Sequence, residues 1–231
     1  MKTKHSFARG GFSFVDLLLI VAAVAGIFFV LLPTLTRSHR HRPGLQCSNN
    51  LKQISISFRI WAGDNNDKTP TQVSQMNGGA MELAETGSAY AVFLVLSNEL
   101  NTPKILFCPN ESNPKRRMAS IFASTVPPGA NEWTIPFTET NSISYFVGLD
   151  AVDTKPEMIL TGDDHFDIAG VKPKPGLFLL QTNAPVEWRN ERHPKQGNVS
   201  LADGSVQGFS TATFRRALVQ TGIATNRLAM P

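Results

Sequence analysis

The longest apolar segment of the chain lies near its N-terminus. Residues 12–32 form a run of 21 in which only Ser13, Asp16 and Gly26 fall outside the hydrophobic set. As a helix rising 1.5 Å per residue, this run would extend about 32 Å, which matches the hydrocarbon core of a bilayer. The sequence therefore predicts a membrane-spanning helix over residues 12–32.

Residues 47–63 carry two overlapping patterns. Apolar side chains spaced 3, 4 and 3 residues apart indicate one face of a helix (Leu51, Ile54, Phe58, Trp61). An alternating set indicates a strand instead (Ile54, Ile56, Phe58, Ile60). Periodicity alone leaves both open. The Pro43-Gly44 pair just before this segment is a strong breaker of regular structure.

The remaining chain alternates between short apolar runs and turn residues. Strands are predicted near 143–148, 157–161, 177–181, 198–202 and 205–209, and residues 105–108 resemble a further short strand. A short helical run is expected within 87–100 and another helix from about 211. Together with the long N-terminal helix, these elements predict an α+β fold with an antiparallel sheet.

Loops separate these elements. Asp203-Gly204 joins two predicted strands as a two-residue type I′ turn. Residues 119–141 read as a proline-rich insertion in which Trp133 is expected to anchor packing, and the tail to Pro231 is expected to be loose. Residues 64–67 predict a loop that ends a helix, with a Ca²⁺ site as the alternative.

Composition and charge sharpen this picture. The chain has 231 residues, 42% of them hydrophobic and 17% charged, so a disordered chain is excluded. Of the net charge of +4, Lys2, Lys4 and Arg9 supply three within the first eleven residues. Because the charge is concentrated there, the basic balance does not indicate nucleic-acid binding.

Asp16 is the one charged residue inside the apolar run. An ionised carboxylate deep in hydrocarbon costs roughly 2.5–3.5 kcal/mol on insertion scales. Asp16 stands one turn inside the run, so it either sits hydrated at the membrane interface or meets a partner charge. Three Lys or Arg residues flank each side of the run, so the distribution of positive charge does not decide its orientation.

The segment GGFSFVDLLLIVAAVAGIFFVLLP resembles the N-terminus of type IV prepilins and type II secretion pseudopilins. The resemblance implies a leader over residues 1–11, cut between Gly11 and Phe12 by a prepilin peptidase that then methylates the new N-terminus at Phe12. Asp16 becomes the fifth mature residue, where the family usually has Glu. The acid at this position is expected to pair with the N-terminal amine of a neighbouring subunit and so to set the stagger of a filament.

The same resemblance implies a domain organisation and a location. Residues 12–32 form the transmembrane and polymerisation segment, and residues 33–63 continue the helix, with a kink expected near Pro43. Residues 64–231 form a globular α+β head of the pilin-like type. The chain is expected in a bacterial inner membrane as a single-pass protein, with its N-terminus cytoplasmic and its head periplasmic or extracellular.

A second resemblance is carried by two separate segments. Residues 47–54 read CSNNLKQI, and His193 is followed by nine residues and then Asp203-Gly204. Both segments are similar to the H-X9-DG subgroup of prepilin-like proteins, in which the first of them is helical. We therefore expect a helix over 47–63. His193 has several open roles: closing the sheet near the hairpin, pairing with a carboxylate such as Asp203, joining Asp163 or Asp164 at a metal, or acid–base chemistry.

The two cysteines and the acidic segment are the remaining candidates for chemistry. An extracytoplasmic head would permit a Cys47–Cys108 disulfide, with two free thiols as the alternative. Neither cysteine has CxxC spacing, so no metal site through sulfur is predicted. Residues 163–167 predict a turn, with a divalent metal as a weaker alternative (Asp163, Asp164, His165, Asp167).

The function expected from these features is structural. The chain lacks a GxSxG elbow, a P-loop and an HExxH pair, so no enzyme is predicted, and no cofactor apart from a weak Ca²⁺ alternative. Its expected partners are the prepilin peptidase, other pilin or pseudopilin subunits, the inner-membrane assembly platform and the membrane. The alternatives are a minor pilin or adhesin binding through 119–141 or 163–167, and a tethered hydrolase using His193, Asp203 and Asp163.

Overall fold

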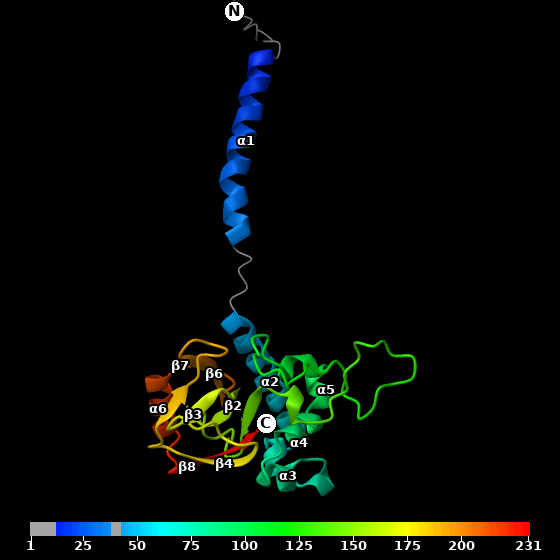
Figure 1. Ribbon diagram of the computed structural model, residues 1–231, viewed down its shortest axis with the longest axis vertical. Helices are drawn as coiled ribbons and strands as arrows, with labels where there is room; N and C mark the ends of the chain where they lie inside the picture. The colour runs from blue at the N-terminus through cyan, green and yellow to red at the C-terminus, as the bar shows by residue number, and fades with distance from the viewer. Residues whose placement is uncertain (1–12, 38–42) are drawn as a thin grey trace, which may run out of the picture. The chain divides into compact units, whose positions relative to one another are not determined.

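The computed structural model describes the backbone of residues 13–37 and 43–231 and the side chains of residues 13–29 and 44–231. The chain forms two compact units, Met1–His41 and Arg42–Pro231, which are described separately (Figure 1). Gly11 and Phe12, where the cleavage and methylation are predicted, lie outside the described residues.

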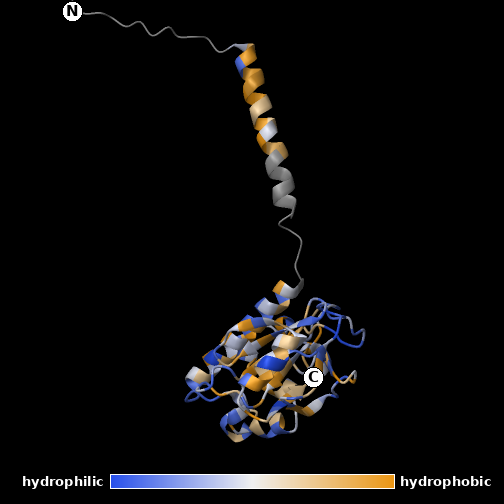
Figure 2. Ribbon diagram, turned by 90° about the vertical axis from the view of Figure 1, so that its left-hand side faces the viewer, coloured by the Kyte–Doolittle hydropathy of each residue, from blue (hydrophilic) through white to orange (hydrophobic). Residues whose placement is uncertain are grey.

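Helix α1 (Phe14–Arg37) is the only element described in the first unit. Ser13 caps its first turn, because the Ser13 carbonyl accepts from Leu17 N at 3.2 Å and the Asp16 carboxylate accepts from Ser13 N at 2.9 Å. Residues 14–29 of this helix are mostly hydrophobic (Figure 2), and their large apolar side chains are exposed, with Phe14 74% and Phe29 85% exposed. Among the described residues, no helix meets the length and hydropathy that a membrane crossing requires.

Helix α2 (Pro43–Asp64) opens the second unit. A proline fits the first turn of a helix, where its missing N–H would have no intrahelical acceptor. The helical pattern predicted within 47–63 is confirmed, and the alternating pattern is wrong, because Ile56 and Ile60 are about half exposed. The buried face of α2 carries one residue per turn (Cys47, Leu51, Ile54, Phe58, Trp61). The kink expected near Pro43 cannot be located, since residues 38–42 lie outside the described part of the chain.

A six-stranded antiparallel sheet forms the centre of the second unit, which we call the head (Arg42–Pro231), and confirms the α+β class. Its spatial order is β4-β8-β1-β2-β6-β7. The strands are β1 (Tyr145–Gly148), β2 (Ile159–Asp163), β4 (Gly176–Gln181), β6 (Gln196–Leu201), β7 (Val206–Ser210) and β8 (Thr225–Met230). The five strands predicted from the sequence are all present, each within two residues of its expected limits.

Both faces of the sheet are covered. On one face lie α2 and the short helices α3 (Met81–Glu85), α4 (Ala89–Val95) and α5 (Ser97–Leu100), with the 3₁₀ turns Pro70–Gln72, Gln75–Asn77, Pro103–Leu106 and Thr140–Ser142. On the other lie α6 (Thr211–Gln220) and a two-stranded sheet of β3 (Phe166–Ile168) and β5 (Val186–Trp188). Because the sheet is buried on both sides, β1 and β2 are buried at every position.

Three local predictions are corrected by the structure. The C-terminal tail is not loose, because β8 lies between β4 and β1 inside the sheet. The segment around Leu106 is a 3₁₀ turn and not a strand. Trp133 is 76% exposed and anchors no packing.

The hairpin turn between β6 and β7 differs from the predicted type. Only Gly204 adopts a positive φ (+79°), whereas a type I′ turn needs two such residues. Gly204 N donates to Leu201 O at 2.9 Å, and Leu201 N donates to Ser205 O at 3.0 Å. The loop is therefore three residues long and ends on a left-handed glycine.

Candidate functional site

Four buried side chains meet where the start of α2 lies beside the end of β2 and the segment that precedes β6. They are Cys47 on α2, Cys108 after the 3₁₀ turn Pro103–Leu106, Asp163 at the end of β2, and His193. We call them the Cys–His–Asp cluster. Their sulfur, nitrogen and oxygen atoms all lie within 4.8 Å of one another.

The two cysteines of this cluster form a disulfide. Their Cα atoms are 5.5 Å apart, and both side chains are fully buried. The bond joins residues 61 positions apart and fastens the first turns of α2 to the loop before β1. Of the two states that the sequence left open, the structure has the bridged one.

His193 lies against both the disulfide and Asp163. His193 Nε2 is 3.6 Å from Asp163 Oδ2 and 3.7 Å from Cys108 Sγ. Burial, followed by the positive charge of Arg192, lowers the pKa of His193. The imidazole is therefore neutral near pH 7, with one ring nitrogen free to act as an acceptor or a ligand.

Asp163 is completely buried and is only partly satisfied. Its Oδ2 accepts from Asn198 N at 2.7 Å and from Asn198 Nδ2 at 3.0 Å, while Oδ1 has no hydrogen-bond partner among the described residues. Burial raises the pKa of Asp163 to about 7, although the hydrogen bonds from Asn198 and the charge of Arg192 lower it. This carboxyl therefore changes its charge close to neutral pH.

Beside the cluster lies a ring of four buried charges. Arg116 contacts Glu111 at 2.9 Å and Asp164 at 2.5 Å, and Arg192 contacts Asp164 at 2.6 Å and Glu111 as well. Burial alone would raise the pKa of both carboxyls, but the two guanidinium groups outweigh it and lower the pKa of Asp164 and of Glu111. The ring is neutral overall, so it can be buried at a tolerable cost only while it is complete.

His165 lies beside this charged ring and against Trp188 of the aromatic core. Its Nε2 is 3.1 Å from Gln196 O, and its ring centroid is 5.2 Å from that of Trp188. Burial, then the charges of Arg192 and His193, lowers the pKa of His165 to about 3. Nε2–H therefore donates to the carbonyl, and Nδ1 is left without a hydrogen-bond partner among the described residues.

The acidic segment 163–167 is not the predicted turn. Asp163 ends β2, Asp167 lies in β3, and only Asp164 and His165 link the two strands. The four weak metal candidates do not converge, because Asp164 belongs to the charged ring and Asp167 lies 3.7 Å from Arg189 Nε at the edge. Only Asp163 joins a group of ligand atoms.

The Asp203-Gly204 turn lies at the other end of β6 from His193, so the proposed His193–Asp203 pair is wrong. The turn is held by α2 instead: Lys52 Nζ donates to Gly204 O at 2.7 Å and an Arg59 guanidinium N–H donates to Asp203 O at 2.7 Å. The Asp203 carboxylate accepts from Ser205 N at 2.7 Å. The structure therefore does not assemble the His193, Asp203 and Asp163 set considered for a hydrolase.

Residues 64–67 form the helix-terminating loop that the sequence predicts. Helix α2 ends at Asp64, and Asn66 and Asp67 adopt left-handed φ values of 56° and 57°. Asp67 N donates to Ala62 O at 2.9 Å, which closes the end of the helix.

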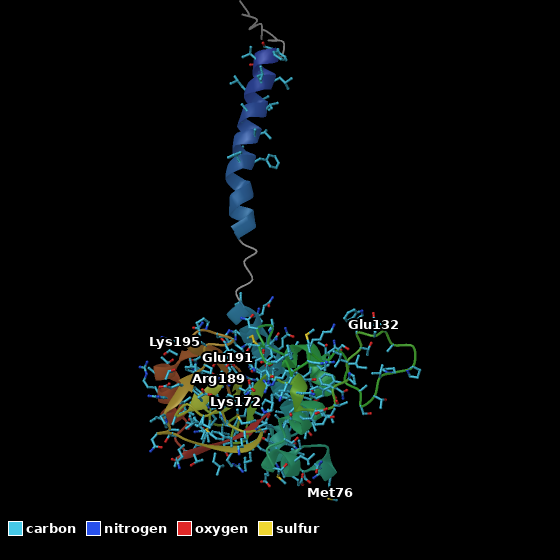
Figure 3. The ribbon with its side chains drawn as sticks, viewed as in Figure 1. Met76, Glu132, Lys172, Arg189, Glu191 and Lys195 are labelled. Atoms are coloured by element: carbon cyan, nitrogen blue, oxygen red, sulfur yellow. A yellow bond between two sulfur atoms is a disulfide. The ribbon has the colours of Figure 1, made fainter. Side chains whose placement is uncertain are left out.

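An open hollow of about 480 Å³ lies next to the charged ring. Its lining includes His165, Arg192, Lys172, Arg189 and Glu191. The last three are labelled on the near face of the head in Figure 3. The hollow gives solvent a route to the rim of the ring.

The sequence did not point to Glu111, Arg116 or Arg192, since charged residues that far apart in the chain carry no spacing signal.

Comparison of the chain with protein-family models, with curated proteins and with solved structures finds no match.

Proposed function

We propose that this chain is a structural, prepilin-like subunit that is cut and N-methylated by a prepilin peptidase and then assembles into a type II secretion pseudopilus or a type IV pilus-like filament. The observation that carries the proposal is the outward-facing apolar surface of α1, a separate unit of the chain. A surface of this kind needs a lipid or protein partner.

The one acid of that surface supports the same role. Asp16 stands in the first turn of α1, where it accepts from its own Ser13 N–H. After cleavage at residues 11–12, the new amine would lie one residue before Ser13. A carboxylate in this position can pair with the amine of a neighbouring copy, and low dielectric would favour such a pair over an isolated charge. Repetition of this contact from copy to copy makes an open, helical assembly.

The head is compatible with this role. Helix α2 packs its apolar face on an antiparallel sheet, which is the arrangement expected of a pilin-like head. We propose that the run 12–32 holds the protein in the inner membrane, with the head on the periplasmic or extracellular side. This part of the proposal rests on the sequence, since Phe12 and the side chains of 30–32 lie outside the described residues.

Mass spectrometry of the protein extracted from membranes tests the proposal directly. The expected N-terminus is a methylated Phe12, and a strain that lacks prepilin peptidase should retain residues 1–11. An intact Met1 in the presence of active peptidase would overturn the proposal.

Assembly is tested separately with two variants of Asp16. Asp16→Asn removes the charge and should abolish cross-linking between copies, with cleavage at Gly11 unchanged. Asp16→Glu keeps the charge and still reaches Ser13 N, as Glu does in a capping box, so cross-linking should persist. Equal cross-linking by all three proteins would contradict the role assigned to Asp16.

One observation favours a second candidate, a ligand-binding minor subunit. A loop within the segment 119–141 projects from the head (Figure 1), and Trp133 of this segment is 76% exposed. Deletion of residues 124–134 should abolish ligand capture in this case and leave incorporation into a filament intact. Loss of incorporation alone would assign the segment to assembly.

A further inference from the structure

We propose that the Cys–His–Asp cluster is a metal site when its disulfide is reduced, binding one divalent ion of the zinc class through two thiolates, His193 and Asp163. The disulfide and the metal are then two mutually exclusive states of the same buried cluster. This inference does not depend on the proposed assembly role.

The spacing of the ligand atoms fits such an ion. Zinc–sulfur bonds of about 2.3 Å and zinc–nitrogen or zinc–oxygen bonds of about 2.0–2.1 Å place tetrahedral ligand atoms about 3.3–3.8 Å apart. His193 Nε2 lies 3.7 Å from Cys108 Sγ, and it lies 3.6 Å from Oδ2 of the Asp163 carboxylate, whose other oxygen, Oδ1, is the proposed ligand. All four candidate ligand atoms lie within 4.8 Å of one another, so small side-chain rotations would complete the site.

The surroundings also fit a ligand set of this kind. Asp163 is held in place through Oδ2 by two donors of Asn198, which leaves Oδ1 buried and without a hydrogen-bond partner in the described part of the chain. A buried carboxylate oxygen without a partner is costly, and a metal ion would satisfy it. Asn198 then acts as an outer partner that orients the ligand.

Charge and donor type favour a borderline metal over calcium. Two sulfurs, one imidazole and one carboxylate suit zinc or cobalt, whereas calcium requires six or more oxygen ligands. With two thiolates, one carboxylate and a neutral histidine, the occupied site carries a net charge of −1. Arg192 is close enough to influence the pKa of both Asp163 and His193, and its positive charge offsets this anionic set.

Conversion between the two states requires an external reductant. A phosphine and one water molecule reduce the disulfide to two thiols, and the phosphine leaves as its oxide. Binding of the divalent ion then releases one proton from each thiol, and a third from Asp163 where this carboxyl was protonated. Because the ion binds only the dithiol, free metal at about 100 times its Kd should shift the dithiol–disulfide equilibrium about 100-fold toward the dithiol.

Cobalt provides a direct test. The full chain in detergent is reduced with a phosphine under argon, the reductant is removed, and Co²⁺ is titrated. The expected result is one Co²⁺ per chain, with the sulfur-to-cobalt charge-transfer and tetrahedral ligand-field bands, both lost on addition of Zn²⁺. The oxidised protein should show neither band.

Variants assign the ligands. His193→Gln and Asp163→Asn should each weaken Co²⁺ binding at least tenfold and alter the ligand-field bands, while His165→Gln, a neighbouring buried histidine outside the cluster, should leave the spectrum unchanged. Circular dichroism of the oxidised variants identifies any that fail to fold. In that case Cys47→Ser and Cys108→Ser are the second pair of ligand variants, and each should weaken Co²⁺ binding in the same way.

Two results would overturn the inference. One is the absence of thiolate–cobalt bands in reduced, folded wild-type protein. The other is Co²⁺ binding that is equally tight in the wild type, His193→Gln and Asp163→Asn, which would show that the two sulfurs bind the ion without His193 and Asp163.

Discussion

His165 should make the head sensitive to acid. Its pKa falls from 6.5 to about 3 in the folded protein, because the ring is buried and because Arg192 and His193 lie close to it. The unfolded chain therefore takes up a proton at His165 below pH 6.5, whereas the folded chain stays neutral there until about pH 3. Stability from this group is complete above pH 6.5 and is lost as the pH falls toward 3.

The magnitude follows from the shift. When the unfolded state binds one proton that the folded state does not bind, the free energy of unfolding falls by about 1.36 kcal/mol for each unit by which the pH falls. At pH 6.5 the unfolded histidine is half protonated, so between pH 6.5 and 4.5 His165 should lower the free energy of unfolding by about 2.3 kcal/mol. Asp163 acts in the opposite direction over the same range, because its folded pKa is raised to about 7. The effect of His165 must therefore be measured as a difference between two proteins.

His165→Gln supplies that difference. A glutamine amide does not titrate and can still donate to Gln196 O. The variant should be less stable at pH 7, since it loses the ring contact with Trp188. Between pH 6.5 and 4.5, however, its free energy of unfolding should fall by about 2.3 kcal/mol less than that of the wild type.

The assay is urea unfolding of the full chain in a mild nonionic detergent, followed by tryptophan fluorescence at several pH values. Lys172→Gln serves as the control, because it alters the same hollow and leaves His165 in place. Parallel curves for wild type and His165→Gln, or an NMR titration of His165 with a pKa near 6.5, would refute the reasoning.

Three further predictions concern the supports of the head, each measured as a change in the urea midpoint. Replacement of both Cys47 and Cys108 by alanine should cost about 4 kcal/mol, the chain-entropy figure for a 61-residue separation; no change on reduction of the wild type would contradict it. Gly204→Ala should cost about 1–2 kcal/mol because φ is +79°, and Gly204→Asn less; equal costs would exclude backbone strain as the cause. Lys52→Met should cost about 1 kcal/mol through loss of its bond to Gly204 O, with Lys52→Arg closer to the wild type; a larger loss for Arg than for Met would refute this.

Local patterns were sufficient for most elements of the head. The 3-4-3 spacing from Leu51 to Trp61 fits the helix that the structure has, but the alternating pattern over the same residues left a strand open until the resemblance of CSNNLKQI favoured a helix. The short apolar runs at residues 143–210 depend on side chains that are close in sequence, and the structure has the strands that they predict. The same is true of the loop after Asp64. The C-terminal strand β8 was missed because its burial comes from β1 and β4, which flank it from distant parts of the chain.

The site divides in the same way. The sequence by itself determined which residue types were available for chemistry: two cysteines, His193 and the acids at 163–167. Only the tertiary structure decided their partners, because a pairing such as Asp163 with Asn198 or Cys47 with Cys108 joins residues whose separation carries no periodic signal. It placed His193 beside the disulfide instead of Asp203, since β6 separates the two ends of that motif. Burial then set the charge states, which depend on the neighbours that folding supplies and not on the order of residues along the chain.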